Sequence, residues 1–200
     1  MSVSYPIMET FYSIQGEGYY QGHAAFFIRL AGCDVGCVWC DVKESWDAGQ
    51  HQNKTVDELV TEVKQSQTEL VIITGGEPMM YDCTPLTQAL QNAGYKTNLE
   101  TSGAYPLSGN WDWICVSPKK FKAPIVDVLK QGNELKVIVF NKSDLDWAIQ
   151  HAQNVNEHCI LYLQPEWSKE KEMLPIITDF IQQNPTWKLS LQIHKYMGVR

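Results

Sequence analysis

The sequence predicts an α/β fold in which parallel β-strands alternate with α-helices. Short apolar runs of strand type are separated by stretches with helical periodicity, and this alternation is typical of repeated βα units. With about six core strands, the chain has too few for a closed eight-stranded barrel, so an open partial barrel or a doubly wound sheet remains. In both, a functional site forms at the carboxyl ends of the strands. The length fits a single domain over residues 1–200.

The predicted elements follow one another along the chain. The first full strand is expected at His23–Leu30, which leads directly into a cysteine-rich loop. Thr55-Val-Asp-Glu58 has the composition of a capping box and predicts a helix that continues to about Gln67. Leu70–Thr74 is a continuous apolar run, as in a strand buried on both faces. Later strands are expected at residues 96–100, 113–117, 134–140, 159–164 and 187–193, and later helices at 85–93, 143–154 and 169–183.

Composition excludes several classes of function. The formal net charge of −7, without any lysine- or arginine-rich block, argues against a nucleic-acid-binding surface. No apolar run approaches the roughly 20 residues that span a bilayer, and the first residues lack the basic and apolar segments of a secretory leader. We therefore expect a cytoplasmic protein that has no nucleic-acid or membrane partner.

Three cysteines within eight residues form the most distinctive motif. Cys33, Cys37 and Cys40 have the spacing C-x3-C-x2-C. Three thiolates on one tight loop can each bind one iron of a [4Fe–4S] cube and leave the fourth iron open to a small molecule. A zinc ion with a fourth ligand from His51 or Asp41, or a coincidence of spacing, is the alternative.

The other cysteines show no ligand spacing. Cys83, Cys115 and Cys159 are scattered along the chain, and we expect them to be small buried apolar residues. A framework of three disulfides is not expected in a chain of this length without a secretory leader.

Glycines, hydroxyls and charged residues follow several of the predicted strands. Gly75-Gly-Glu-Pro78 would let a ligand approach the backbone, and Glu77 would accept hydrogen bonds from a cationic group, although glycine pairs also simply end strands. Residues 100–103 and 117–120 place hydroxyls and lysines at two further strand ends, where ordinary turn chemistry is the alternative.

Three further features stand out near the chain ends. Arg29 lies inside an apolar strand and needs an anionic partner, either a substrate carboxylate or a structural carboxylate. His194 is expected at the end of the last strand, as a site residue or as a structural histidine. Residues 11–18 hold polar groups between glycines, and a hairpin turn is the plain interpretation of this segment.

The motifs together resemble those of the radical S-adenosylmethionine (SAM) superfamily and, within it, the 7-carboxy-7-deazaguanine synthase family. The resemblance covers essentially the whole chain in order. It rests on Ser13–Gly18, Phe27–Cys33 followed by the remaining cysteines, Ile73–Pro78, Glu100–Gly103, Val116–Lys119 and Gln192–Tyr196.

The resemblance implies a compact, open (β/α)6-type barrel and an unusual ring contraction. The expected substrate is 6-carboxy-5,6,7,8-tetrahydropterin, which becomes 7-carboxy-7-deazaguanine and ammonia on the route to queuosine and other 7-deazapurines. The implied cofactors are a [4Fe–4S] cluster, SAM and Mg2+. A flavodoxin- or ferredoxin-type electron donor and a homodimer are implied as well.

The resemblance also implies which residues contact the cluster, SAM and the substrate. The three cysteines of the loop would bind the cluster. Contacts to SAM are expected from Trp39, Cys40, Asp41, Gly76, Glu77, Ser102, Ser117, Pro118 and Lys119. Contacts to the pterin are expected from Ile14, Gln15, Gly16, Glu17, Arg29, Thr74, Gln164 and His194.

One position departs from the family pattern. Where relatives commonly carry a Thr or Ser that binds Mg2+, this chain has Val42, whose side chain contains no oxygen. We therefore expect a shallower dependence on Mg2+ than in relatives that carry the hydroxyl. Two alternatives to the ring-contracting enzyme are another small radical SAM enzyme, such as a glycyl-radical activase, and a non-catalytic iron–sulfur or zinc module.

Overall fold

The computed structural model describes residues 3–200 and contains one nine-stranded sheet. The first two residues of the predicted domain, Met1 and Ser2, lie outside the described residues. The strand order is β3-β1-β2-β4-β5-β6-β7-β8-β9, and the strands from β2 to β9 run parallel. The strands are β1 (Ser4–Ile14), β2 (Ala24–Leu30), β3 (Asn53–Thr55), β4 (Leu70–Gly75), β5 (Lys96–Thr101), β6 (Trp113–Val116), β7 (Glu134–Val139), β8 (Ile160–Pro165) and β9 (Trp187–Leu189).

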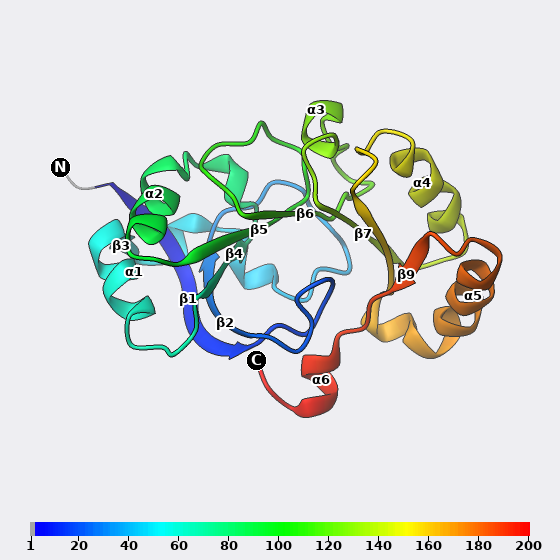
Figure 1. Cartoon of the computed structure of the whole chain (residues 1–200), viewed down its shortest axis with the longest axis horizontal. Helices are drawn as coiled ribbons and strands as arrows, with labels where there is room; N and C mark the ends of the chain where they lie inside the picture. Colours follow the sequence, from blue (N-terminus) through cyan, green and yellow to red (C-terminus); the bar gives the residue numbers. More distant parts are fainter. Residues whose placement is uncertain (1–2) are drawn as a thin grey trace.

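The sheet curves into an open barrel with helices around its outside (Figure 1). Apolar residues from the outer face of the strands and from the first five helices form one large core. The helices are α1 (Val56–Val63), α2 (Thr84–Asn92), α3 (Val126–Leu129), α4 (Ser143–Ala152), α5 (Glu170–Gln183) and α6 (Ile193–Met197). The partial barrel, and not the doubly wound alternative, is therefore the observed architecture.

Strand alternation makes the inside of the barrel polar. Successive side chains of a strand point to opposite faces, so the residues between the outward apolar positions face inward. Arg29 on β2 pairs in register with Thr74 on β4, and Lys136 on β7 pairs with Tyr162 on β8. A small apolar cluster, Ala25, Phe27, Leu70 and Ile72, forms the only second core among residues 3–200.

The capping-box prediction is confirmed. Thr55 caps α1 with its hydroxyl, and the Glu58 carboxylate accepts from the Thr55 backbone N–H at 2.7 Å. The helix ends at Val63 rather than near Gln67, because Gln65 and Ser66 donate to carbonyls three residues back and close the chain into turns.

Both ends of the predicted element order need correction. The first strand is β1, which pairs antiparallel with β2, so residues 15–23 form the connection of a hairpin. The last strand ends at Leu189 and not at residue 193, and Ile193–Met197 forms α6 instead. His194 therefore lies on a short helix. Figure 1 shows α6 apart from the other helices, beside the chain end.

No helix among the described residues is long and apolar enough to cross a membrane.

Candidate active site

A cavity of about 260 Å3 opens at the carboxyl ends of the parallel strands. It is lined by the hairpin connection after β1, the cysteine loop after β2, the ends of β4 to β8 and the segment around α6. This is the position in which parallel α/β barrels carry their functional sites. The cavity therefore brings together segments from both ends of the chain.

Nearly all residues that the sequence singled out line this cavity. Pro118 is the exception: it is buried, while its neighbours Ser117 and Lys119 reach the cavity wall. The predicted residues that line it are Ile14, Gln15, Gly16, Glu17, Arg29, Cys33, Cys37, Trp39, Cys40, Asp41, Val42, Thr74, Gly76, Glu77, Ser102, Ser117, Lys119, Gln164 and His194.

The three cysteines of the loop lie at the cavity wall as free thiols. Two backbone bonds tie the start of the loop to the following segment: Gly32 N–H donates to the Ser45 carbonyl and Cys33 N–H to the Trp46 carbonyl. Gly32 and Gly36 have φ angles of 102° and 74°, a conformation that favours glycine. Burial raises the pKa of Cys37 to about 11, so iron must displace the proton of this thiol when it binds.

The donor set fits an iron–sulfur cube better than a single metal ion. In a cube each cysteine binds a different iron, so the sulfur atoms need not converge on one point. Within residues 3–200 no three Cys, His, Asp or Glu side chains converge on a single ion site. The His51 of the zinc alternative does not line the cavity, and its Nε2 lies 2.8 Å from the Glu44 carbonyl oxygen. The other thiols behave as expected: Cys83 and Cys115 are buried, and Cys159 is partly buried.

The glycine pair after β4 packs against the cysteine loop. A Cβ atom at Gly76 would lie 2.2 Å from the carbonyl oxygen of Gly32 and 2.9 Å from the Cβ of Cys33. Gly76 N–H donates to the Leu30 carbonyl, and Glu77 N–H donates to the Gly32 carbonyl. The two glycines therefore allow a close approach of backbone to backbone, which holds the cysteine loop against the strand ends.

Glu77 has its hydrogen-bonding capacity taken up inside the protein. Only 1% of the residue is exposed. One carboxylate oxygen accepts from Met79 N–H and the Thr101 hydroxyl, and the other accepts from the backbone N–H and hydroxyl of Ser102. The structure thus corrects the expectation of a free acceptor for a cationic group, because Glu77 joins the end of β5 to the loop after β4.

Lys119 and Trp39 lie together at the cluster side of the cavity. The Lys119 ammonium group lies 5.7 Å from the centre of the Trp39 ring and donates to the carbonyl oxygen and hydroxyl of Ser117. Burial lowers the pKa of Lys119. The ammonium group and the indole ring line the same wall as the cysteines, where they are available to a bound ligand.

Arg29 has a structural carboxylate, Glu9, as its partner, one of the two alternatives that the sequence left open. Its Nε donates to the Glu9 carboxylate across the β1–β2 pair at 3.0 Å. No hydrogen bond involves its two terminal nitrogens within the described residues, and the side chain lines the cavity. A structural ion pair therefore orients the guanidinium, whose free edge matches the two oxygens of a carboxylate.

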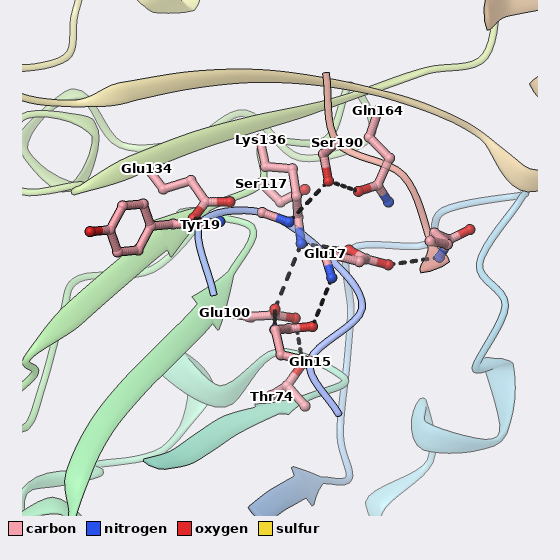
Figure 2. A network of polar contacts seen from close by, with 12 residues as sticks. Gln15, Glu17, Tyr19, Thr74, Glu100, Ser117, Glu134, Lys136, Gln164 and Ser190 are labelled. Carbon is pink, nitrogen blue, oxygen red and sulfur yellow. Dashed lines mark hydrogen bonds and ion pairs between the residues drawn. The ribbon is translucent and has the colours of Figure 1, made fainter. Parts of the chain in front are cut away.

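A network of charged groups also lines the cavity, and sequence reasoning missed its central residue, Lys136. The side chain of Lys136 is 4% exposed, and its ammonium nitrogen lies 2.5 Å from Glu17 and 3.6 Å from Glu100. Glu100 also accepts from Gln15 at 2.9 Å and from Thr74 at 3.3 Å (Figure 2). The sequence does contain a signal for Lys136, because it lies within an apolar strand. The same observation singled out Arg29.

The ionisation of this network follows from its contacts. Burial raises the pKa of Glu17, but the charge and hydrogen bond of Lys136 outweigh it and lower the pKa to about 2. Burial opposes the charge of Lys136, yet Glu100 and Glu17 raise its pKa well above the usual range. The wall therefore presents a fixed cation between carboxylates at neutral pH.

Helix α6 closes the site over the hairpin connection. Ile193 N–H donates to the Gly16 carbonyl, and a Cβ atom at Gly16 would lie 2.1 Å from the imidazole Nδ1 of His194. Burial lowers the pKa of His194. Lys195 contacts Asp41 at 3.2 Å and so joins this helix to the cysteine loop.

Comparisons with known proteins agree with this geometry. Residues 27–119 match the family model described as the radical SAM superfamily. The chain is 50% identical to proteins named 7-carboxy-7-deazaguanine synthase from Flavobacterium psychrophilum, covering 97% of this chain and 92% of the relative, and from Synechocystis, covering 100% and 96%. The crystal structure of QueE from Escherichia coli matches with a TM-score of 0.83 and 30% identity over 94% of each chain.

Proposed function

We propose that this chain, which belongs to the 7-carboxy-7-deazaguanine synthase family of radical SAM enzymes, converts 6-carboxy-5,6,7,8-tetrahydropterin to 7-carboxy-7-deazaguanine and ammonia. The observation that carries this proposal is the single cavity in which the cysteine loop, the Gly-Gly-Glu-Pro turn and the Arg29 guanidinium meet. A carboxylated substrate suits that guanidinium.

Cys33, Cys37 and Cys40 would hold a [4Fe–4S] cluster, with SAM beside Trp39, Gly76 and Lys119. When bound, the cluster and SAM would supply the radical chemistry that starts the reaction. The protein's own residues position the pterin and exclude water.

The pterin would lie between Arg29 and the Lys136 network. Arg29 would bind the substrate carboxylate through its terminal nitrogens, because its Nε is held by Glu9. Gln15, Thr74 and Glu100 form a hydrogen-bonded set on the wall, whose remaining acceptors suit ring N–H donors. The buried cation of Lys136 keeps Glu17 ionised and so fixes the charge that the ring meets.

We also propose that Mg2+ is weakly held or dispensable in this chain. Val42 lines the cavity without an oxygen, and Asp41 next to it is paired with Lys195. The residues present therefore offer Mg2+ fewer oxygen ligands than a hydroxyl-bearing relative.

The partners implied by the family complete the proposal. A flavodoxin- or ferredoxin-type protein would deliver the electron, two copies of the chain would form a homodimer, and the enzyme would work in the cytoplasm. The six free thiols suit a reducing compartment. Light scattering of the purified protein measures the dimer directly.

The test of function is an anaerobic reaction. The cluster is reconstituted and reduced, SAM and 6-carboxytetrahydropterin are added, and mass spectrometry identifies the product. We expect 7-carboxy-7-deazaguanine. A glycyl-radical activase would cleave SAM without forming a deazapurine, and a non-catalytic module would leave SAM intact.

A further inference from the structure

A second, smaller cavity lies beside the active-site cavity inside the barrel. Its volume is about 10 Å3, close to the lower limit for one molecule of the size of water. The two cavities share Gln15, Glu17 and Glu100 as walls. The remaining lining residues are Tyr20, Ile72, Asn98, Leu99, Trp113, Cys115 and Glu134, and we name this space the Glu134 cavity.

Two unpartnered oxygen atoms belong to residues that line this cavity. Among residues 3–200 only three buried side-chain polar atoms lack a hydrogen-bond partner, and two of them are Asn98 Oδ1 and Glu134 Oε1. Both residues are 3% exposed. Buried acceptors are costly unless a donor satisfies them, and a small molecule with N–H or O–H groups in the Glu134 cavity would supply such donors.

The charges around the cavity favour a cation as that donor. Its lining contains three glutamates and no lysine or arginine. Lys136 pairs with Glu17 and Glu100, whereas Glu134 has no ion-pair partner in the described part of the chain. Figure 2 shows Glu134 beside Tyr19, whose backbone N–H donates to its Oε2, as does the Trp113 indole. Burial raises the pKa of Glu134, although the charge of Lys136 and the hydrogen bonds from Tyr19 and Trp113 oppose this shift.

We propose that the Glu134 cavity binds an ammonium ion, with Glu134 Oε1 and Asn98 Oδ1 as its acceptors. Ammonium has about the size of water, donates four hydrogen bonds and offsets the unpaired charge. Its source rests on the proposed function, which releases ammonia in the adjoining cavity. Ammonia accepts a proton from solvent water, so that one N–H bond forms as one O–H bond breaks and hydroxide stays in the solvent; the resulting ammonium ion donates to Glu134 Oε1 and Asn98 Oδ1.

The first test measures binding without turnover. Thermal unfolding of the cluster-loaded enzyme is followed anaerobically in ammonium, potassium and sodium chloride at equal concentration and pH. At a ligand concentration about 100 times Kd, we expect ammonium to raise Tm above the sodium value by on the order of 5 °C. Equal Tm values in all three salts would overturn the proposal, as would equal stabilisation by potassium.

Two variants and a matched control locate the effect. Glu134→Gln keeps the acceptor for Tyr19 and Trp113 but removes the charge, and Asn98→Ala removes the second acceptor. We expect both to lose the difference between ammonium and sodium. Glu157→Gln, at an exposed position, should retain it. An unchanged difference in both cavity variants would contradict the site.

A second readout connects the site to turnover. If the ammonia of the reaction enters this cavity, ammonium chloride should inhibit deazapurine formation several-fold more than sodium chloride, and Glu134→Gln should abolish that difference. Equal inhibition by both salts would contradict the connection to turnover. Failure to form any deazapurine would instead contradict the proposed function, while the thermal measurements would still decide whether ammonium binds.

Discussion

At the scale of single residues, Arg29 shows how one side chain can serve structure and recognition together. Its Nε is held by Glu9, and its side chain lines the cavity. A lysine at this position keeps the charge but cannot form two parallel hydrogen bonds to a carboxylate.

We predict that Arg29→Lys raises the KM for the carboxypterin by about 10- to 100-fold, because a charge-assisted hydrogen bond contributes roughly 1.5–3 kcal/mol. Steady-state kinetics and SAM binding measure the effect, and SAM affinity should stay unchanged. Glu9→Gln is the control, since it weakens the ion pairs of Glu9 with Arg29 and Arg200 but leaves the Arg29 guanidinium in place. An equal rise of KM in both variants would assign Arg29 a structural role alone.

Val42 allows a test at the same scale. Val42→Thr adds a hydroxyl with almost no change in shape, at the position where the family commonly has a Mg2+ ligand. We predict that the variant responds to Mg2+ several-fold more strongly than the parent, as measured by rates with and without a chelator. Parent activity that disappears completely on removal of Mg2+ would contradict the proposal of weak binding.

At the scale of elements, the contact between the β4 turn and the cysteine loop sets the cluster site. Gly76→Ala would place a methyl group 2.2 Å from the Gly32 carbonyl oxygen, so the loop must move. We predict a protein that folds but retains less than half of the parent's iron and sulfide after reconstitution. Gly49→Ala meets only a side-chain oxygen at 3.2 Å and serves as the control. Full iron content in Gly76→Ala would show that the loop tolerates displacement.

Most elements could be predicted because their signals are local. Thr55 and Glu58 specify a helix start by themselves, and Leu70–Thr74 is apolar throughout, so both were placed correctly. Strand β1 was missed because its burial alternates irregularly and it contains a bulge between Ile7 and Glu9. Helix α6 has five residues, and its position depends on contacts with Gly16 and Asp41 that are far away in the sequence.

The site was predicted best where residue type and strand position agreed. Cys33, Arg29 and Thr74 were recognised from motifs and lie at the cavity. Lys136 was missed because its partners, Glu17 and Glu100, are distant in the sequence and are brought next to it only by the fold. Glu77 was predicted to contact a ligand because the sequence does not show its internal hydrogen-bond donors. These donors, Thr101 and Ser102, lie at the end of another strand.

At the scale of the whole molecule, the buried charges inside the barrel couple stability to pH. The folded-state pKa of Glu17, about 2, lies below its ordinary value of 4.5. A carboxyl group with a depressed pKa stabilises the fold above its unfolded-state pKa, and this contribution is lost as pH falls toward the folded-state value.

We therefore predict that unfolding stability declines between about pH 5 and pH 2, and that Glu17→Gln flattens this decline. The contribution of Glu17 is on the order of 3 kcal/mol, since each pKa unit is worth about 1.4 kcal/mol. Urea titrations at several pH values measure it, with the exposed Glu157→Gln as control. Parallel pH profiles for the parent and Glu17→Gln would refute this role.

The central claim is that one cavity performs a radical ring contraction that releases ammonia. Its most direct test is the stoichiometry of the anaerobic reaction: 7-carboxy-7-deazaguanine, ammonia and consumed SAM are measured together. We predict one ammonia for each deazapurine, with SAM regenerated rather than consumed. SAM cleavage without deazapurine, from an enzyme that carries its full cluster, would contradict the account.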